Sequence, residues 1–130
     1  MFIAQENYRY SNLVKEELWH EKGFCTKQVT VNDAAASLVI GTVLGQVTAD
    51  GKYKVSVQTA TDGSETPAAI VVEDITIPAA TDTEVLVMYR GPAEVSKGAL
   101  VLDASFTAGA LQDAAYAALE AKLIQVADTV

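Results

Sequence analysis

The 130-residue chain is poor in the residues that most catalytic and metal sites require. It contains one cysteine, Cys25, and one histidine, His20. A single cysteine excludes an intramolecular disulfide framework, and transition-metal coordination would have to rest on carboxylates. A pair of Cys25 and His20 would lack a third group to orient it for nucleophilic catalysis. We therefore predict no catalytic residues, no metal site and no cofactor, and we do not expect an enzyme.

Positive charge and long apolar runs are scarce as well. Nine Lys and Arg residues stand against 17 Asp and Glu residues, a net charge of −8. Proteins that bind phosphate backbones or anionic lipids need a basic face, so we expect neither nucleic acid nor a membrane as a partner. The longest near-continuous apolar run, 34–44, is shorter than the ~18 residues of a membrane span. The first ten residues lack a signal-peptide pattern, and nothing in the sequence indicates an oxidising compartment.

Local motifs for ligands are weak. The acid pairs Glu73–Asp74 and Asp82/Glu84 are the candidate calcium ligands, but adjacent acids point to opposite faces of a strand, and a charged strand edge also guards against aggregation. The glycines of the 41–45 segment, GTVLG, are not followed by the Lys-Ser/Thr of a phosphate-binding loop. Gly41 and Gly45 more simply mark a close backbone approach or a bulge within a sheet.

The first 28 residues differ from the rest of the chain. They hold five of the nine aromatic residues and the only histidine, together with charges of both signs. Neither a helical nor a strand period persists through them. We predict an extended N-terminal arm over 1–28, with a segment packed on its own domain as the alternative.

From residue 29 onward the sequence consists of short β-like runs with turn signals between them. Asp50-Gly51 and Asp62-Gly63 are strong turn signals. Between them, residues 52–59 alternate, with Tyr53 on the apolar face, as a half-buried strand does. Further runs lie at 29–31, 69–72, 75–77, 85–89 and 99–102. This spacing is typical of a small antiparallel β architecture or barrel.

The end of the chain changes period. Leu111, Ala115, Leu119 and Leu123 recur every four residues, which predicts an amphipathic helix over 108–123 with Thr107 as its cap. A short closing strand follows at 124–126. The sequence therefore predicts an α+β, mostly β fold: a small antiparallel β-rich domain over 29–130, tulip- or barrel-like, with one C-terminal helix and the extended arm.

Four segments taken in order resemble a known family. They are 41–45 (GTVLG), 50–53 (DGKY), 60–70 (ATDGSETPAAI) and 82–93 (DTEVLVMYRGPA). Together with the Ala/Leu-rich helix, they make the chain similar to bacteriophage head decoration proteins related to the capsid protein D of phage lambda. The similarity spans about 29–126.

The resemblance implies a structural role on the outer capsid surface of a virion, for a protein made in the cytoplasm of a bacterial host. Proteins of this family form homotrimers at the three-fold positions of the expanded head and clamp the major capsid protein against DNA pressure. Their N-terminal arm adds a strand to a capsid-protein sheet. The side chains expected to anchor the arm here are Tyr8, Tyr10, Leu13, Val14, Leu18 and Trp19.

For the trimer contact we predict the end of one strand and the turn that follows it: Met88, Tyr89, Arg90 and Pro92. Two alternatives stay open. Tyr89 can instead cap the core while Arg90 pairs with an acid of its own chain, and the alanine-rich helix can serve either core packing or a subunit contact.

The competing function is a β-sandwich module that binds carbohydrate or a receptor on a virion or cell surface. Such a module needs an exposed aromatic platform. Beyond the arm the aromatic residues are only Tyr53, Tyr89, Phe106 and Tyr116, a scarcity that disfavours this alternative. A small hydrolase, the third possibility, would require His20 or an acid pair to lie in a pocket.

Overall fold

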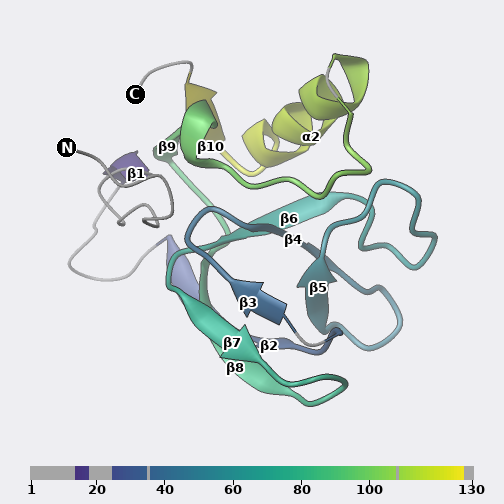
Figure 1. Ribbon diagram of the computed structural model, residues 1–130. Helices are drawn as coiled ribbons and strands as arrows, with labels where there is room; N and C mark the ends of the chain where they lie inside the picture. Colours follow the sequence, from purple (N-terminus) through teal and green to yellow (C-terminus); the bar gives the residue numbers. More distant parts are fainter. Residues whose placement is uncertain (1–13, 18–24, 35, 108, 128–130) are drawn as a thin grey trace, which may run out of the picture.

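The computed structural model describes residues 14–17, 25–34, 36–107 and 109–127 (Figure 1). The elements in chain order are β1 (Val14–Glu17), β2 (Thr26–Val31), β3 (Ala36–Leu38), β4 (Val43–Gln46), β5 (Tyr53–Val55), β6 (Pro67–Val71), β7 (Ile75–Ile77), β8 (Thr83–Met88), β9 (Ala93–Ser96), the 3₁₀ helix η2 (Lys97–Ala99), α2 (Ala110–Glu120) and β10 (Ile124–Ala127). The mostly β, α+β class predicted from the sequence is confirmed. Within these residues, no helix combines the length and the apolar character that a membrane span needs.

Five strands close into a barrel in the order β2-β5-β4-β6-β8. Neighbouring strands are antiparallel except for β2 and β5, which run parallel and meet through the pair Val31 and Tyr53. The amide of Asn32 extends this junction by donating to the Tyr53 carbonyl at 3.0 Å. A two-stranded ribbon, β3 with β7, contributes Leu38 and Ile77 to the apolar cluster of the barrel.

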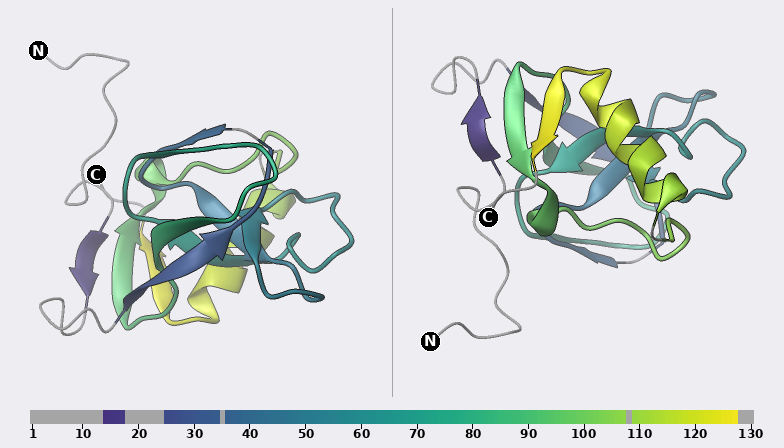
Figure 2. Two further views of the ribbon diagram at one scale, coloured as in Figure 1. Left: turned by 90° about the horizontal axis from the view of Figure 1, so that it is seen from below. Right: turned by 90° about the horizontal axis from the view of Figure 1, so that it is seen from above.

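A second layer, the upper layer, packs against the outer face of the barrel strands β4, β6 and β8. In the view from above, β1, β9, β10 and α2 lie side by side across the barrel (Figure 2). In this layer β9 is the middle strand of a three-stranded sheet, with β1 antiparallel on one side and β10 parallel on the other. The helix α2 contacts both β10 and the barrel strand β6. The helix therefore packs against both its own layer and the barrel.

Two apolar clusters result from this arrangement. We call the first the barrel cluster: Val29, Val31, Leu38, Leu44, Tyr53, Ala69, Val71, Ile77, Val85 and Val87. We call the second, between the barrel and the upper layer, the layer cluster: Cys25, Val43, Ile70, Val72, Met88, Ala93, Val95, Ala99, Leu119 and Ile124.

The uninterrupted apolar run 69–72 covers the end of the barrel strand β6 and the residue after it. Its successive side chains point to opposite faces, so Ala69 and Val71 enter the barrel cluster while Ile70 and Val72 enter the layer cluster. All four are buried. A strand covered on both faces needs no polar alternation.

The predicted turns and close approaches are confirmed. Gly51 and Gly63 have φ of 74° and 103°, a region that favours glycine. A Cβ on Gly41 would overlap the carbonyl oxygen of Ala99, and one on Gly45 would overlap that of Ser64. The pairing of β4 with β6 also shifts register next to Gly45. Both sequence readings of these glycines therefore hold.

One predicted strand is longer than the structure shows, and another is wrong. The alternating segment 52–59 is a strand only to Val55, because Ser56, assigned to the polar face, is buried and donates its hydroxyl to the Ser64 carbonyl at 2.8 Å. The segment 99–102 is not a strand: η2 ends at Ala99, and Val101 makes a single bridge to Thr42. Strand β9, which the sequence did not predict, precedes η2.

The predicted helix is shorter than the periodicity suggested. Gly109, with φ of 94°, is the N-cap in place of Thr107, and α2 ends at Glu120. Leu123 is not on the buried stripe: it lies beyond the helix with φ of 64° and is 66% exposed. The chain turns there to enter β10, whose first residue, Ile124, is fully buried. The predicted closing strand is confirmed as β10.

Candidate functional site

The predicted arm reaches the described structure only in part. Tyr8, Tyr10, Leu13, Leu18 and Trp19 lie outside the described residues. Val14 is the first residue of β1, whose backbone pairs with β9 from Val14 opposite Val95 to Glu17 opposite Ala93, with a register irregularity between Val14 and Glu16. The predicted boundary after Gln28 falls inside β2.

Strand β1 forms an outer edge of the small sheet in the upper layer (Figure 2). Beside it, β9 is paired on both sides, so its backbone groups are already used. An edge strand presents unpaired main-chain N–H and C=O groups that another extended segment can bind. The sheet therefore offers the geometry for strand addition at β1.

The predicted contact residues at 88–92 lie where β8 leaves the barrel. Met88 is fully buried in the layer cluster, so its side chain anchors the turn. Tyr89 is half-buried, whereas Arg90 and Pro92 are exposed. The amide of Tyr89 donates to the Cys25 carbonyl at 3.0 Å, and the Cys25 thiol donates to the Pro92 carbonyl at 3.7 Å. Cys25 is thus a buried structural residue at the base of this turn.

Two cations lie against the ring of Tyr89. Lys27 Nζ is 4.3 Å from the ring centroid, and the guanidinium carbon of Arg90 is 5.0 Å from it. Contacts of this type contribute about 0.5–1 kcal/mol at exposed sites. The two contacts bring positive charge together at one point of a protein whose net charge is −8.

The turn is fixed to the end of α2. The amides of Gly91 and Ala93 donate to the carbonyls of Lys122 and Leu123 at 2.8 and 3.1 Å. A Cβ on Gly91 would overlap the Leu123 carbonyl oxygen, so the two backbones are in direct contact. This docking brings the exposed Leu123 next to the turn. We name the resulting turn surface by its residues: Tyr89, Arg90, Pro92 and Leu123.

Sequence reasoning missed Leu123 because the four-residue period continued through it. The signal that could have identified it is the small number of residues between the helix and the closing strand, which leaves room only for a turn. Ile124 must be buried as the first residue of β10, which forces the preceding residue outward. Leu123 and Val101 are the exposed large apolar residues in the described part of the chain.

The candidate calcium ligands accept hydrogen bonds from backbone amides or from side chains of the same chain. Glu73 accepts the Leu86 amide at 2.7 Å, and Asp74 accepts the Ile40 amide at 2.9 Å. Asp82 accepts from Asn32 and Lys52, which lowers its pKa, while Glu84 accepts the Thr30 hydroxyl. Across the ranges that the structure describes, no three metal-ligating side chains gather into a group that could hold an ion.

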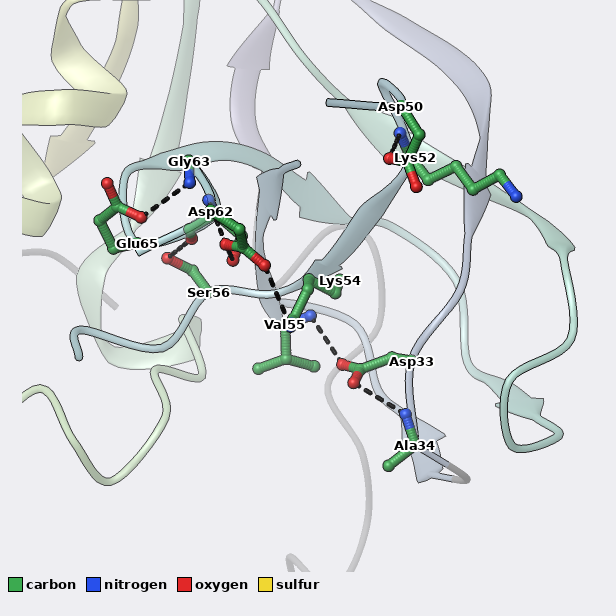
Figure 3. A network of polar contacts seen from close by, with 11 residues as sticks. Asp33, Ala34, Asp50, Lys52, Lys54, Val55, Ser56, Asp62, Gly63 and Glu65 are labelled. Carbon is green, nitrogen blue, oxygen red and sulfur yellow. Dashed lines mark hydrogen bonds and ion pairs between the residues drawn. The ribbon is translucent and has the colours of Figure 1, made fainter. Parts of the chain in front are cut away.

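The densest polar network surrounds the loop between β5 and β6 (Figure 3). Asp62 accepts from the Ser64 hydroxyl at 2.6 Å, the Ser64 amide at 3.0 Å and Lys54 Nζ at 3.4 Å. These hydrogen bonds, chiefly the one from the Ser64 hydroxyl, lower the pKa of Asp62 to about 2. Nearby, Asp33 accepts the amides of Ala34 and Val55. The network holds loops in place, and its acids already have hydrogen-bond donors.

The aromatic residues do not form a sugar platform. Tyr53 and Phe106 are buried, and burial raises the pKa of Tyr53. Tyr89 and Tyr116 are half-buried, and Lys97 Nζ lies 5.1 Å from the Tyr116 ring centroid. Among the aromatic residues whose burial the structure describes, none is fully exposed to solvent. His20, the candidate of the hydrolase alternative, lies outside the described residues.

The chain was compared with known protein families. The family described as bacteriophage lambda head decoration protein D matches residues 5–124. The match covers most of the arm, the barrel, β9 and α2, and it ends at the first residue of β10. No curated protein matches the chain at a significant level.

Proposed function

This chain belongs to the bacteriophage lambda head decoration protein D family, and we propose that it binds the expanded phage head as a homotrimer at the three-fold positions and stabilises the shell against internal DNA pressure. Family membership makes it a structural head decoration protein associated with the outer surface of the capsid. The observation that carries the finer proposal is the extent of the match, which begins at residue 5 and so includes the arm. We further propose synthesis in the host cytoplasm before attachment.

The arm, in this proposal, contacts the major capsid protein by adding a strand to one of its sheets. Main-chain hydrogen bonds then supply affinity, and alternate side chains supply specificity. An arm that orders on contact loses conformational entropy, so one arm binds modestly. Three arms on one trimer raise the effective concentration, and avidity exceeds single-arm affinity by about 10²–10⁴. A ligand that binds only the assembled shell stabilises it by mass action.

The trimer contact, in this proposal, involves the turn surface. A three-fold axis requires two different patches to meet. The exposed Leu123 and Pro92 supply apolar area, and Arg90 supplies a positive group that fits an acidic patch on the neighbouring copy. The outward face of α2 supports close approach at its small exposed positions, Ala110, Ala114, Ala117 and Ala121, which lie among the exposed acids Asp113 and Glu120.

The oligomeric state is tested by size-exclusion chromatography with light scattering. The expected mass is three times the 13.7 kDa of one chain. Arg90→Glu should shift the protein toward monomer, whereas Lys52→Glu, the same charge change at a lysine paired with Asp82, should leave the trimer intact. A monomeric wild-type protein at micromolar concentration would contradict the proposal.

The role of the arm is tested by a truncation that starts the chain at Val14. This cut keeps β1 on β9 and Cys25 in the layer cluster, which a cut after Gln28 would not. The truncated protein should fold and form trimers but no longer bind expanded heads in a sedimentation assay. If it binds as well as the full chain, residues 1–13, with Tyr8, Tyr10 and Leu13, are not the attachment element.

A further inference from the structure

The chain contains the dipeptide Asp-Gly twice, and the two copies have different surroundings (Figure 3). Asp50-Gly51 lies between β4 and β5, and Asp62-Gly63 lies between β5 and β6. Because glycine has no side chain to hinder the approach, its amide nitrogen can attack the side-chain carboxyl carbon of a preceding aspartate. The two copies thus provide a comparison within one molecule.

The reaction is balanced by water alone. The nitrogen of the glycine forms a bond to the aspartate Cγ, and the carboxyl oxygen and two protons leave as one water molecule, giving a succinimide. Water then adds to either carbonyl of the ring. Opening at the main-chain carbonyl gives isoaspartate, in which the backbone runs through the side-chain carbon. No oxidant, reductant or other reactant takes part.

Asp50 and Gly51 are both exposed. One carboxyl oxygen, Oδ1, accepts the Lys52 amide at 3.0 Å, and the Gly51 amide donates only to a backbone carbonyl, that of Val47, at 2.9 Å. The ammonium of Lys52 is directed to Asp82, 3.1 Å away. The carboxyl carbon of Asp50 therefore stays open to solvent and to its neighbour.

Asp62 is held by both carboxylate oxygens. Oδ1 accepts the amide and hydroxyl of Ser64, and Oδ2 accepts Lys54 Nζ. The Gly63 amide donates to Glu65 Oε1 at 2.9 Å, the same distance at which the Gly51 amide donates to the Val47 carbonyl, so the two copies differ in their carboxyl groups. The lowered pKa of Asp62, about 2, keeps the carboxyl ionised, and a carboxylate is a poorer target for attack than the neutral acid.

We propose that Asp50 is a site of spontaneous isoaspartate formation in the folded protein, and that the hydrogen bonds to the carboxylate of Asp62 protect the second Asp-Gly from the same reaction. The modification adds one carbon to the backbone of the turn that leads into β5. That strand carries Tyr53, the residue that pairs with Val31 to close the barrel. The modification therefore falls in the hairpin that places β5 between β4 and β2 in the closed barrel.

The test is prolonged incubation of the folded wild-type protein in a buffer near about pH 5, followed by peptide mapping with enzymatic methylation of isoaspartyl carboxyl groups. Lowering an aspartate pKa from 3.8 to about 2 reduces its protonated fraction at this pH by roughly 60-fold. Isoaspartate should accumulate at residue 50 at least about tenfold faster than at residue 62. The same incubation in denaturant should bring the two rates close together, because only the fold distinguishes the sites.

Variants identify the cause. Asp50→Glu should abolish the signal at residue 50, because its longer side chain would have to form a six-membered ring. Ser64→Ala, which removes the hydroxyl that donates to Asp62 Oδ1, should raise the rate at residue 62 several-fold, while Ser64→Thr, which keeps a hydroxyl donor, should raise it less. Equal rates at the two sites in the folded protein, or a difference that persists in denaturant, would overturn the proposal. An unchanged rate at residue 62 in a folded Ser64→Ala protein would overturn the role given to the hydrogen bonds of Asp62.

Discussion

The barrel cluster and the layer cluster share the strands β4, β6 and β8, but they draw their other residues from different kinds of sequence. The barrel cluster is completed by strands and by the β3–β7 ribbon. The layer cluster is completed by a turn residue, Cys25, by the short strand β9 and by the ends of α2 and β10. The barrel thus closes mainly through strand pairing, whereas the upper layer is attached to it by individual side chains and close backbone contacts.

The largest effects should come from removing a fully buried leucine from each cluster. Leu44→Ala in the barrel cluster and Leu119→Ala in the layer cluster should each cost about 2–5 kcal/mol in the free energy of unfolding. Leu123→Ala, at an exposed leucine, should change it by less than about 0.5 kcal/mol. Chemical denaturation measures all three.

Hydrogen exchange on the same variants tests whether the two clusters are separable. Leu44→Ala should accelerate exchange throughout the molecule. Leu119→Ala should accelerate it most in α2 and β10, because elements with few long-range backbone pairings open locally. If Leu119→Ala raises exchange in the barrel strands equally, the two clusters form one cooperative unit and the distinction is lost.

The contrast between the clusters also explains what the sequence could predict. Alternating strands have a period of two, and the turns at Asp50-Gly51 and Asp62-Gly63 mark their ends, so most barrel strands were found. Strand β9 was missed because it follows Pro92 directly and is only four residues long. Its burial depends on contacts with Ile124 and Leu119, which no local pattern records.

The candidate site was predictable to a similar degree. The turn at 88–92 was identified, and the exposure of Arg90 and Pro92 suits a contact surface. The anchoring role of Met88 was not, because a residue next to a turn gives no sign that it fills a second cluster. The docking of Gly91 on Leu123 is a contact between residues far apart in the chain, and sequence spacing does not encode it.

A smaller effect should follow from separating the turn from the helix. Gly91→Ala places a Cβ against the carbonyl of Leu123 and the amide of Ala93, so the backbone must move and we expect a loss of about 1–3 kcal/mol. Gly98 is the matched control, since a Cβ there meets nothing within 4 Å. Thermal unfolding should show a clear decrease for Gly91→Ala and almost none for Gly98→Ala. Equal changes would mean that the contact with Leu123 does not hold the upper layer.

The barrel side offers a corresponding loop contact. Ser56→Ala removes the hydroxyl that donates to the buried Ser64 carbonyl, and an unsatisfied buried acceptor costs about 1–3 kcal/mol. Relaxation of the loop should place the effect at the lower end of that range. Ser37→Ala is the control, because its hydroxyl pairs with Thr76 at the surface, 3.4 Å away. Denaturant midpoints that fall equally for both variants would contradict the importance given to the Ser56 contact.

The smallest expected effect is a dependence of stability on pH, which comes from an acid in the loop between β5 and β6. The pKa of Asp62 is about 2 in the folded protein, below its ordinary value of 3.8, so its ionised form is favoured by folding. The contribution is fully present above about pH 4 and is lost as the pH falls toward about 2. The pKa values of Asp82 and Asp103 are lowered as well and act in the same direction.

Asp62→Asn isolates this contribution. It should lower the melting temperature slightly at neutral pH, and its difference from wild type should shrink as the pH is lowered through the window between about 4 and 2. Glu120→Gln, at an exposed acid on α2, is the control from the upper layer. The Asp62 carboxylate accepts hydrogen bonds from Ser64 and Lys54. Hydrogen exchange should therefore accelerate most in the β5–β6 loop when the pH is lowered. A difference between Asp62→Asn and wild type that stays constant with pH would show that the carboxylate does not link the charge of this loop to the stability of the barrel.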